Sequence, residues 1–154
     1  MAEYVFRAST TIDLPIDKVF AFFSNAENLK LITPAQFGFH IITPLPIEMR
    51  KGTLIEYSLT LYGFPVRWKT EITCWEPPHS FEDTQLRGPY KQWIHEHRFT
   101  AIDPGTTLME DHVRYRLPLE PIGDLADFFV AREIAKIFEY RNEIIADITR
   151  SSST

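Results

Sequence analysis

The amino-acid sequence predicts an α+β fold in which a curved antiparallel sheet of about seven strands wraps around a long C-terminal helix, with two short helices after the first strand. Residues 38–118 alternate between apolar and polar side chains in segments that turn-forming residues separate, which is the pattern of consecutive antiparallel strands. Residues 122–148 carry apolar side chains at helical spacing and contain no proline. Because a long amphipathic helix must bury its apolar side, we expect it to lie against the concave face of the sheet.

The chain begins with a strand and two short helices. Residues 4–12 alternate in the manner of a half-buried strand. Pro15 favours the start of a helix, which Asn25 ends. Residues 26–32 predict a second short helix. It should end before Thr33, because Pro34 disfavours helical backbone in the residue before it.

The central part of the chain predicts six further strands. The Pro77-Pro78 pair and the run from Asp103 to Gly105 are clear turns between them. The expected strands cover residues 40–43, 53–62, 66–74, 80–86, 90–102 and 106–117.

The last expected element is the long helix, which at ~1.5 Å per residue would span roughly 35–40 Å. Glu139, Arg141 and Glu143 are expected on its solvated side, with structural packing as the alternative for Arg141. We expect one domain over residues 1–149 and a disordered tail over residues 150–154. The predicted apolar stripe consists of Leu125, Phe128, Phe129, Arg132, Ala135, Ile137 (or Phe138) and Ile144.

Charge and composition exclude several classes of protein. The 154 residues carry a net charge of −5, which is unlike the basic surface of a nucleic-acid-binding protein. No apolar run approaches the roughly 18 residues that cross a bilayer, so no membrane insertion is expected. The single cysteine, Cys74, and an N-terminus unlike a signal peptide predict a cytoplasmic location. The glycines lack phosphate-loop spacing, no cofactor is expected, and the sequence carries no indication of the oligomeric state.

Aromatic residues make up 14% of the chain, which suits a large core or a cavity lined with rings. The stretch KQWIHEHRFTAID, residues 91–103, adds polar groups to such a surface. Alternation along this strand puts Trp93, His95, His97 and Phe99 on one face. Two histidines between two large aromatic residues on an inward face therefore need an explanation.

Three explanations are open for the histidine pair. A metal site would need a third and a fourth ligand beyond the two imidazoles, from Asp111 or Asp83, and no HExxH or CxxC motif is present, so we expect no metal. A histidine beside a carboxylate can instead transfer protons near neutral pH. In the third and leading interpretation, the histidines are hydrogen-bonded to groups such as Asp111 or Tyr115, or face solvent at a sheet edge, and any ligand is bound without chemistry.

Three segments of the chain carry a family resemblance: IDLPIDKVFAFFSNAENLKLITP, FEDTQLRGPYKQWIHEHRFTAIDPGTTLMEDHVRYRLP and the closing IFEYRNEII. In this order and spacing they resemble the START-like superfamily, also called Bet v 1-like or SRPBCC, and within it the polyketide cyclase/dehydrase-like branch of small bacterial proteins. The resemblance covers residues 4–148 and implies the helix-grip fold. It also implies a deep, mostly apolar cavity under the long helix for a lipid-like, polyketide-like or aromatic small molecule. Because this fold hosts many functions, the resemblance does not fix one.

The resemblance also implies which residues line that cavity, provided that the strand register matches the family's, since a shift of one residue would turn the set outward. The candidates for acid–base catalysis are His95, Asp111 and Tyr115. The expected ligand-binding residues are Tyr57, Leu59, Trp68, Thr70, Phe81, Asp83, Gln85, Trp93, His95, His97, Val113, Tyr115, Phe128, Phe129 and Arg132.

Three functions follow as hypotheses. A protein that binds a hydrophobic or amphipathic small molecule predicts a cavity of a few hundred Å³ or more. A cyclase or dehydratase predicts, in addition, a histidine hydrogen-bonded to an aspartate or tyrosine and open to the cavity. A protein-interaction module predicts a filled interior and an exposed apolar patch.

Overall fold

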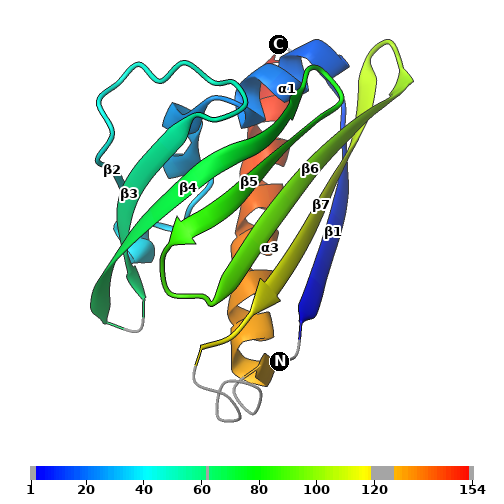
Figure 1. Cartoon of the computed structure of the whole chain (residues 1–154). Coiled ribbons are helices and arrows are strands. Elements are labelled where there is room, and N and C mark those ends of the chain that lie inside the picture. The colour runs from blue at the N-terminus through cyan, green and yellow to red at the C-terminus, as the bar shows by residue number, and fades with distance from the viewer. Residues whose placement is uncertain (1–2, 62, 119–126, 153–154) are drawn as a thin grey trace.

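In the part of the chain that the structure describes, seven strands form one antiparallel sheet (Figure 1). This computed structural model describes residues 3–61, 63–118 and 127–152, without the side chains of residues 128, 129, 148 and 150–152. The strands lie in the order β1-β7-β6-β5-β4-β3-β2, so β2 to β7 form a meander and β1 pairs with β7. The strands are β1 (Tyr4–Ile12), β2 (His40–Ile41), β3 (Leu54–Leu61), β4 (Phe64–Glu76), β5 (Ser80–Arg87), β6 (Gln92–Asp103) and β7 (Thr106–Arg116).

The alternation that predicted the strands is visible in their burial. On β7, every second residue from Thr107 to Tyr115 is buried, and the residues between them are partly or fully exposed. On β6, His95, His97 and Phe99 are buried in the same way. Because one face of each strand meets the interior and the other meets solvent, period-two patterning is enough to locate these strands.

The first helix, α1 (Ile16–Phe23), starts directly after Pro15 and buries Val19, Phe20 and Phe23. The second predicted helix is instead a tight 3-10 turn, η1 (Ala26–Lys30), and a further 3-10 turn, η2 (Ala35–Phe37), was not predicted. The side chain of Asn25 accepts a hydrogen bond at the start of η1, and Gly38 ends η2 with a φ of 53°. Such short turns carry too few residues to show a helical period in the sequence.

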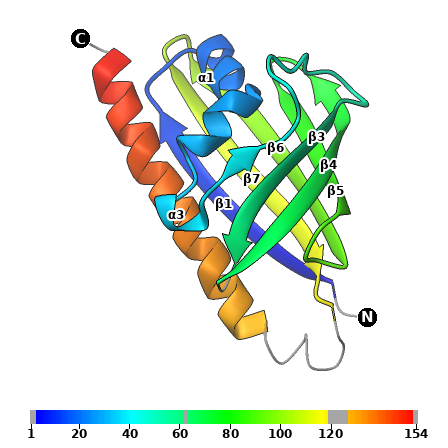
Figure 2. The same ribbon diagram turned by 90° about the vertical axis from the view of Figure 1, so that its left-hand side faces the viewer.

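The long helix, α3 (Asp127–Ser152), lies across the concave side of the sheet, with α1 at one end of the space between them (Figures 1 and 2). This arrangement confirms the predicted α+β helix-grip fold. The helix continues three residues past position 149, where the sequence predicted the domain to end. Among the described residues, no helix combines the length and apolarity that a bilayer crossing requires.

The predicted apolar stripe of α3 was right at Phe138, which is buried, and in part at Ile137 and Ile144, which are partly buried, but wrong at its other described positions. Ile134, Phe138, Arg141 and Ile145 are the buried positions, whereas Arg132 and Ala135 are exposed. The stripe was placed from residues near the start of the helix, and those residues, Leu125, Phe128 and Phe129, lie outside the described residues or side chains. Because several sides of this helix carry apolar residues, only the position of the sheet decides which side is buried.

Two of the three packed clusters among the described residues flank the space under α3. One lies beside α1 and contains Phe20, Phe99 and Met109 together with Ile145 of α3. The other lies under the middle of α3, where Val113 of β7 packs with Ile134 and Phe138. The space between the sheet and α3 that these clusters leave open is the cavity described below.

Candidate functional site

A cavity of about 200 Å³ lies between the concave face of the sheet and α3. Strands β3 to β6 form one wall, and α3 contributes Ile134, Phe138 and Arg141 to another. The lining is mostly apolar, and its aromatic rings come from Phe23, Tyr57, Trp68, Phe81, Tyr90, Trp93 and Phe138. An apolar cavity with a few polar groups is the usual form of a small-molecule site.

Most of the residues that the sequence proposed as ligand-binding lie on this cavity. They come from four neighbouring strands, which the register brings side by side. These residues are Tyr57, Leu59, Trp68, Thr70, Phe81, Asp83, Trp93, His95 and His97.

The remaining proposed residues lie elsewhere. The Gln85 side chain donates a hydrogen bond to the Tyr90 carbonyl (2.6 Å), across the turn between β5 and β6. Val113 is fully buried under α3, and the Tyr115 hydroxyl donates to Asp127 Oδ1 (2.7 Å) at the start of that helix. Arg132 is exposed on α3. The family resemblance and the strand alternation placed Gln85, Val113 and Tyr115 toward the cavity, and the predicted helix stripe placed Arg132 there. These patterns do not show which inward positions turn contacts or the helix cover. The side chains of Phe128 and Phe129 are outside the described part of the chain.

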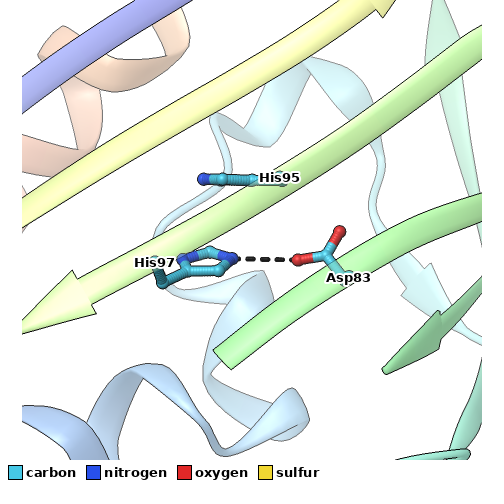
Figure 3. A group of neighbouring side chains, drawn as sticks. All are labelled: Asp83, His95 and His97. Atoms are coloured by element: carbon cyan, nitrogen blue, oxygen red, sulfur yellow. Dashed lines mark hydrogen bonds and ion pairs between the residues drawn. The ribbon is translucent and has the colours of Figure 1, made fainter. Parts of the chain in front are cut away.

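Two histidine–aspartate pairs lie at the polar part of the cavity, where Asp83, His95 and His97 line it. Figure 3 shows these three residues and the contact between His97 and Asp83. His95 Nε2 lies 2.7 Å from Asp111 Oδ1, and His97 Nε2 lies 2.9 Å from Asp83 Oδ2. The two imidazole rings stack on each other with centroids 3.7 Å apart and planes tilted by 24°. Phe81 stacks on the other face of His97 at 4.1 Å, so both rings are held by neighbours on the sheet.

The two pairs are diagonal across the strands. In the register, Asp83 lies directly opposite His95, and Asp111 lies directly opposite His97. Each aspartate nevertheless hydrogen-bonds the other histidine, two residues away along β6. Diagonal neighbours on one face of a sheet are within reach of long side chains. The sequence named Asp111 and Tyr115 as partners for His95, and the structure brings Asp111 to it.

Arg141 completes this group, which we call the charged cluster: Asp83, His95, His97, Asp111 and Arg141. Arg141 Nη1 lies 3.8 Å from Asp111 Oδ1, and the guanidinium lies over the ring of Phe138, 5.0 Å from its centroid. Its side chain is only 8% exposed, which corrects the prediction of a solvated position. The signal that the sequence analysis missed is its helical spacing, because Arg141 follows the buried Ile134 by seven residues.

The two histidines have opposite electrostatic surroundings. Burial lowers the pKa of His95, and the neighbouring His97 lowers it further, which outweighs the effect of the Asp111 carboxylate. Burial also lowers the pKa of His97, but the carboxylates of Asp111 and Asp83 outweigh burial, so its pKa is raised above the ordinary value. His95 therefore favours the neutral form and His97 the protonated form.

Both aspartates remain ionised. Burial raises the pKa of Asp111, but its contacts with His95 and His97 and the charge of Arg141 lower it well below the usual range. Burial also raises the pKa of Asp83, but its hydrogen bond with His97 and the nearby positive charges outweigh burial, so this pKa is lowered as well. With His97 protonated, the charged cluster has two negative and two positive groups, and its charges sum to zero. A buried group of ions is tolerated when its members neutralise one another in this way.

Three buried nitrogen atoms have no hydrogen-bond partner among the described residues: Trp68 Nε1, His97 Nδ1 and Arg141 Nε. His97 Nδ1 lies 3.4 Å from Asp111 Oδ1, which is within reach of an ion pair but without the geometry of a hydrogen bond. All three residues line the cavity. Since buried polar groups in proteins are almost always satisfied, these nitrogens are the first places to look for ligand contacts.

The donor atoms of Asp83, His95 and His97 lie within 4.8 Å of one another, so this set is a candidate for a metal ion. The stacked rings do not suit one. Lone pairs of imidazole lie in the ring plane, and two nearly parallel rings 3.7 Å apart cannot both direct a lone pair at one ion ~2 Å away. Metal binding would require one ring to rotate out of the stack. The absence of a metal stays a prediction.

Comparison with solved structures identifies many with the same fold. The Zhui aromatase/cyclase from Streptomyces sp. R1128 has a TM-score of 0.79 at 12% identity, over 99% of this chain and 97% of that one. TTHA0849 from Thermus thermophilus has a TM-score of 0.77 at 16% identity, over 98% of this chain and 100% of that one. A point mutant of norcoclaurine synthase from Thalictrum flavum has a TM-score of 0.71 at 11% identity, over 99% and 98% of the two chains. At these identities the likeness establishes the fold alone.

Sequence comparison gives the family. No curated protein sequence matches the chain significantly. The family described as polyketide cyclase / dehydrase and lipid transport matches residues 12–139, which covers α1, the sheet from β2 to β7 and the first half of α3. This chain therefore belongs to the polyketide cyclase / dehydrase and lipid transport family.

Proposed function

We propose that this protein is a cyclase- or dehydratase-type enzyme that binds a ring-containing or polyketide-like molecule in the cavity and moves protons within it. The observation that carries the proposal is the 2.7 Å contact between His95 and Asp111 at the edge of a cavity lined with aromatic rings. A hydrogen-bonded histidine–aspartate pair open to the cavity is what separates the enzyme hypothesis from simple binding.

His95 is proposed as the general base. An ionised carboxylate only accepts hydrogen bonds, so Nε2–H of neutral His95 donates to Asp111. The lone pair of Nδ1 is then available, and no described residue hydrogen-bonds to it. The lowered pKa of His95 keeps the ring neutral near pH 7. Asp111 is a positioning residue, because it fixes the tautomer and orientation of the ring without reaching the substrate.

The proposed reaction begins with a carbon acid. His95 removes a proton from the carbon next to a substrate carbonyl, and the electron pair forms an enolate. The enolate carbon attacks a second carbonyl of the same molecule, a carbon–carbon bond forms, and the resulting alkoxide takes the proton back from His95. In a dehydration, loss of a further proton next to the carbonyl expels the hydroxyl group as water. Protonated His97 and Arg141 supply positive charge near the developing oxyanion.

A carrier without catalysis is the second candidate. The mostly apolar lining and the family's description, which includes lipid transport, favour it. An apolar cargo, however, needs no buried ions, and four ionisable side chains of the charged cluster line the cavity: Asp83, His95, His97 and Arg141. A protein-interaction module, which predicts a filled interior, is at odds with a cavity of about 200 Å³.

The test uses 2-tetralone, a bicyclic ketone with an acidic CH₂ between its ring and its carbonyl. We expect the protein to accelerate deuterium incorporation at that carbon in D₂O, measured by NMR. The His95→Asn variant should lose the acceleration by roughly 10²- to 10⁴-fold, the range for removal of a general base. His112→Asn is the matched control, because His112 neighbours Asp111 on β7 but lies on the opposite face of the strand.

Native mass spectrometry of the protein from its own host then identifies any bound compound. Unaccelerated exchange, or acceleration that is equal in His95→Asn and His112→Asn, would contradict the enzymatic proposal. Stoichiometric recovery of a fully saturated lipid in the same preparation would favour the carrier.

A further inference from the structure

We infer that the molecule bound in this cavity is uncharged and carries two hydrogen-bond-accepting oxygens, one for the indole N–H of Trp68 and one for the Nε–H of Arg141. The inference rests on the proposed function, since it narrows the ligand class of the same cavity. It derives from donors that the protein buries and leaves without acceptors.

Trp68 provides the first donor. It is 7% exposed and its ring lines the cavity, where it stacks on Tyr57 at 5.8 Å and meets the edge of Trp93 at 5.5 Å. Its Nε1–H has no acceptor among the described residues. A buried indole almost always finds a hydrogen-bond partner, because the lost hydration of its N–H is otherwise uncompensated. An oxygen of the ligand beside Trp68 would supply that partner.

Arg141 provides the second donor. It is 7% exposed and lines the cavity from α3. Asp111, 3.8 Å from Nη1, and Phe138 hold the guanidinium in place, but Nε has no acceptor within the described part of the chain. A guanidinium in a rigid setting with a buried N–H that lacks an acceptor is a preorganised donor for a carbonyl oxygen, and for the enolate that forms from it.

The two donors have different neighbours, so they contact different parts of a ligand. Trp68 belongs to a group of rings with Tyr57 and Trp93, whereas Arg141 lies near the rings of Phe23 and Phe138. A ligand that satisfies both donors has oxygens on two separate edges. The aromatic rings that line the cavity favour a flat ring system over a flexible chain.

The charge balance favours an uncharged ligand. Asp83 and Asp111 are neutralised by Arg141 and the protonated form of His97. A carboxylate ligand would add a buried negative charge that no further cation of the charged cluster offsets. A neutral carbonyl or phenol oxygen adds none, so the charge balance of the cluster favours it over the carboxylate of a fatty acid.

The test compares two probes of similar shape, 2,6-diacetylnaphthalene and 2,6-diethylnaphthalene, by equilibrium dialysis with the full chain. The wild-type protein should bind the diacetyl compound more tightly. Trp68→Phe keeps the ring and removes the N–H, so it should weaken diacetyl binding roughly 3- to 10-fold and leave diethyl binding within about twofold. Arg141→Lys keeps the charge beside Asp111 and replaces Nε–H by a methylene, and the same selective loss is expected. Trp93→Phe is the control, because it should affect both probes equally.

Equal losses for both probes in Trp68→Phe and in Arg141→Lys would overturn the inference. Tighter binding of naphthalene-2,6-dicarboxylate than of the diacetyl compound would overturn the uncharged ligand. Thermal melting verifies that each variant is folded. If the variants lose diacetyl binding selectively but the protein does not accelerate deuterium exchange in 2-tetralone, the enzyme proposal is refuted and this inference stands. Deuterium exchange that depends on His95, together with equal binding of the two probes, would refute this inference and leave the enzyme proposal standing.

Discussion

Strand β6 passes through two regions of the interior that differ in almost every physical respect. Phe99 is 2% exposed and lies in the apolar cluster beside α1, with Phe20, Phe81 and Met109. His97, only two residues away on the same face, lies in the charged cluster. Both regions are buried, and both are built from the inward residues of the same strand.

Burial contributes to stability in opposite ways in the two regions: it favours folding for the apolar rings and opposes folding for the ionisable groups. Burial of apolar rings stabilises the fold through the hydrophobic effect and close packing. Four of the five side chains of the charged cluster are buried, and Asp83 is partly buried. Burial removes their hydration, and their mutual attraction does little more than offset that loss. A cluster of that kind adds little to stability, which supports its assignment to function rather than to folding.

The largest effect on stability is expected in the apolar region. Phe99→Ala should lower the free energy of unfolding by about 3–5 kcal/mol, because it removes a large ring from a packed cluster and leaves a cavity. Urea unfolding measures this change. Phe64→Ala is the control, because Phe64 is 71% exposed and its removal should change stability by less than about 0.5 kcal/mol. A loss for Phe99→Ala no larger than the control would contradict the core assignment.

Asp111→Asn should have the largest effect within the charged cluster. It leaves His97 and Arg141 as positive groups without one of their buried partners, while the amide still reaches His95. We expect a loss of about 2–3 kcal/mol in unfolding free energy, less than for removal of a charge without a hydrogen-bonding replacement. Glu110→Gln, the exposed neighbour on β7, is the control. Unchanged or increased stability would show that the cluster is not coupled through Asp111.

The pH dependence of stability should separate the two histidines. His97 has a raised pKa in the folded protein, so its contribution is present below the unfolded value of ~6.5 and is lost as the pH rises through the folded pKa. His95 has a lowered pKa, so its contribution is present above ~6.5 and is lost as the pH falls through the folded pKa.

In the wild-type protein these two contributions oppose each other. His95→Asn should therefore lose stability as the pH rises above ~6.5, and His97→Asn should lose stability as the pH falls below it. Urea unfolding between about pH 5 and pH 8.5 measures both slopes, and an NMR titration of the imidazole signals measures the pKa values directly. Slopes of the same sign in the two variants would contradict the opposite surroundings.

The smallest effect is expected from metal ions. Because the stacked rings of His95 and His97 do not converge on one point, zinc at micromolar concentration should leave the melting temperature unchanged. Elemental analysis of the purified protein should find no stoichiometric metal. A melting temperature that rises with zinc in the wild type but not in His97→Asn would assign a metal site to the cluster.

The contrast between the regions also explains what the sequence could predict. The strands were predictable because one face of each meets solvent, and Pro and Gly residues mark the turns between them. His95 and His97 stood out because polar side chains interrupted an aromatic face of β6. Asp111 was among the candidate partners of His95, since it lies on the inward face of the next strand.

The hydrophobic periodicity of the sequence could not predict other features of the site. Arg141 was assigned to the solvated side of α3 because charged neighbours, Glu139 and Glu143, surround it in sequence. Its burial depends on which side of the helix faces the sheet, and the helix carries apolar residues on more than one side. Gln85, Val113 and Tyr115 face inward as expected, but turn contacts or the helix keep them away from the cavity.

By itself, the sequence determined the α+β class, the order of the elements along the chain, the inward face of β6 and the acidic, aromatic-rich composition. These properties follow from local sequence patterns, which do not depend on the contacts between distant elements. Only the tertiary structure decided the diagonal pairing of His95 with Asp111 and of His97 with Asp83, the phase of α3, and the place of Arg141 beside the cavity. Each of these depends on contacts between elements distant in sequence, and the same local pattern is compatible with several such arrangements.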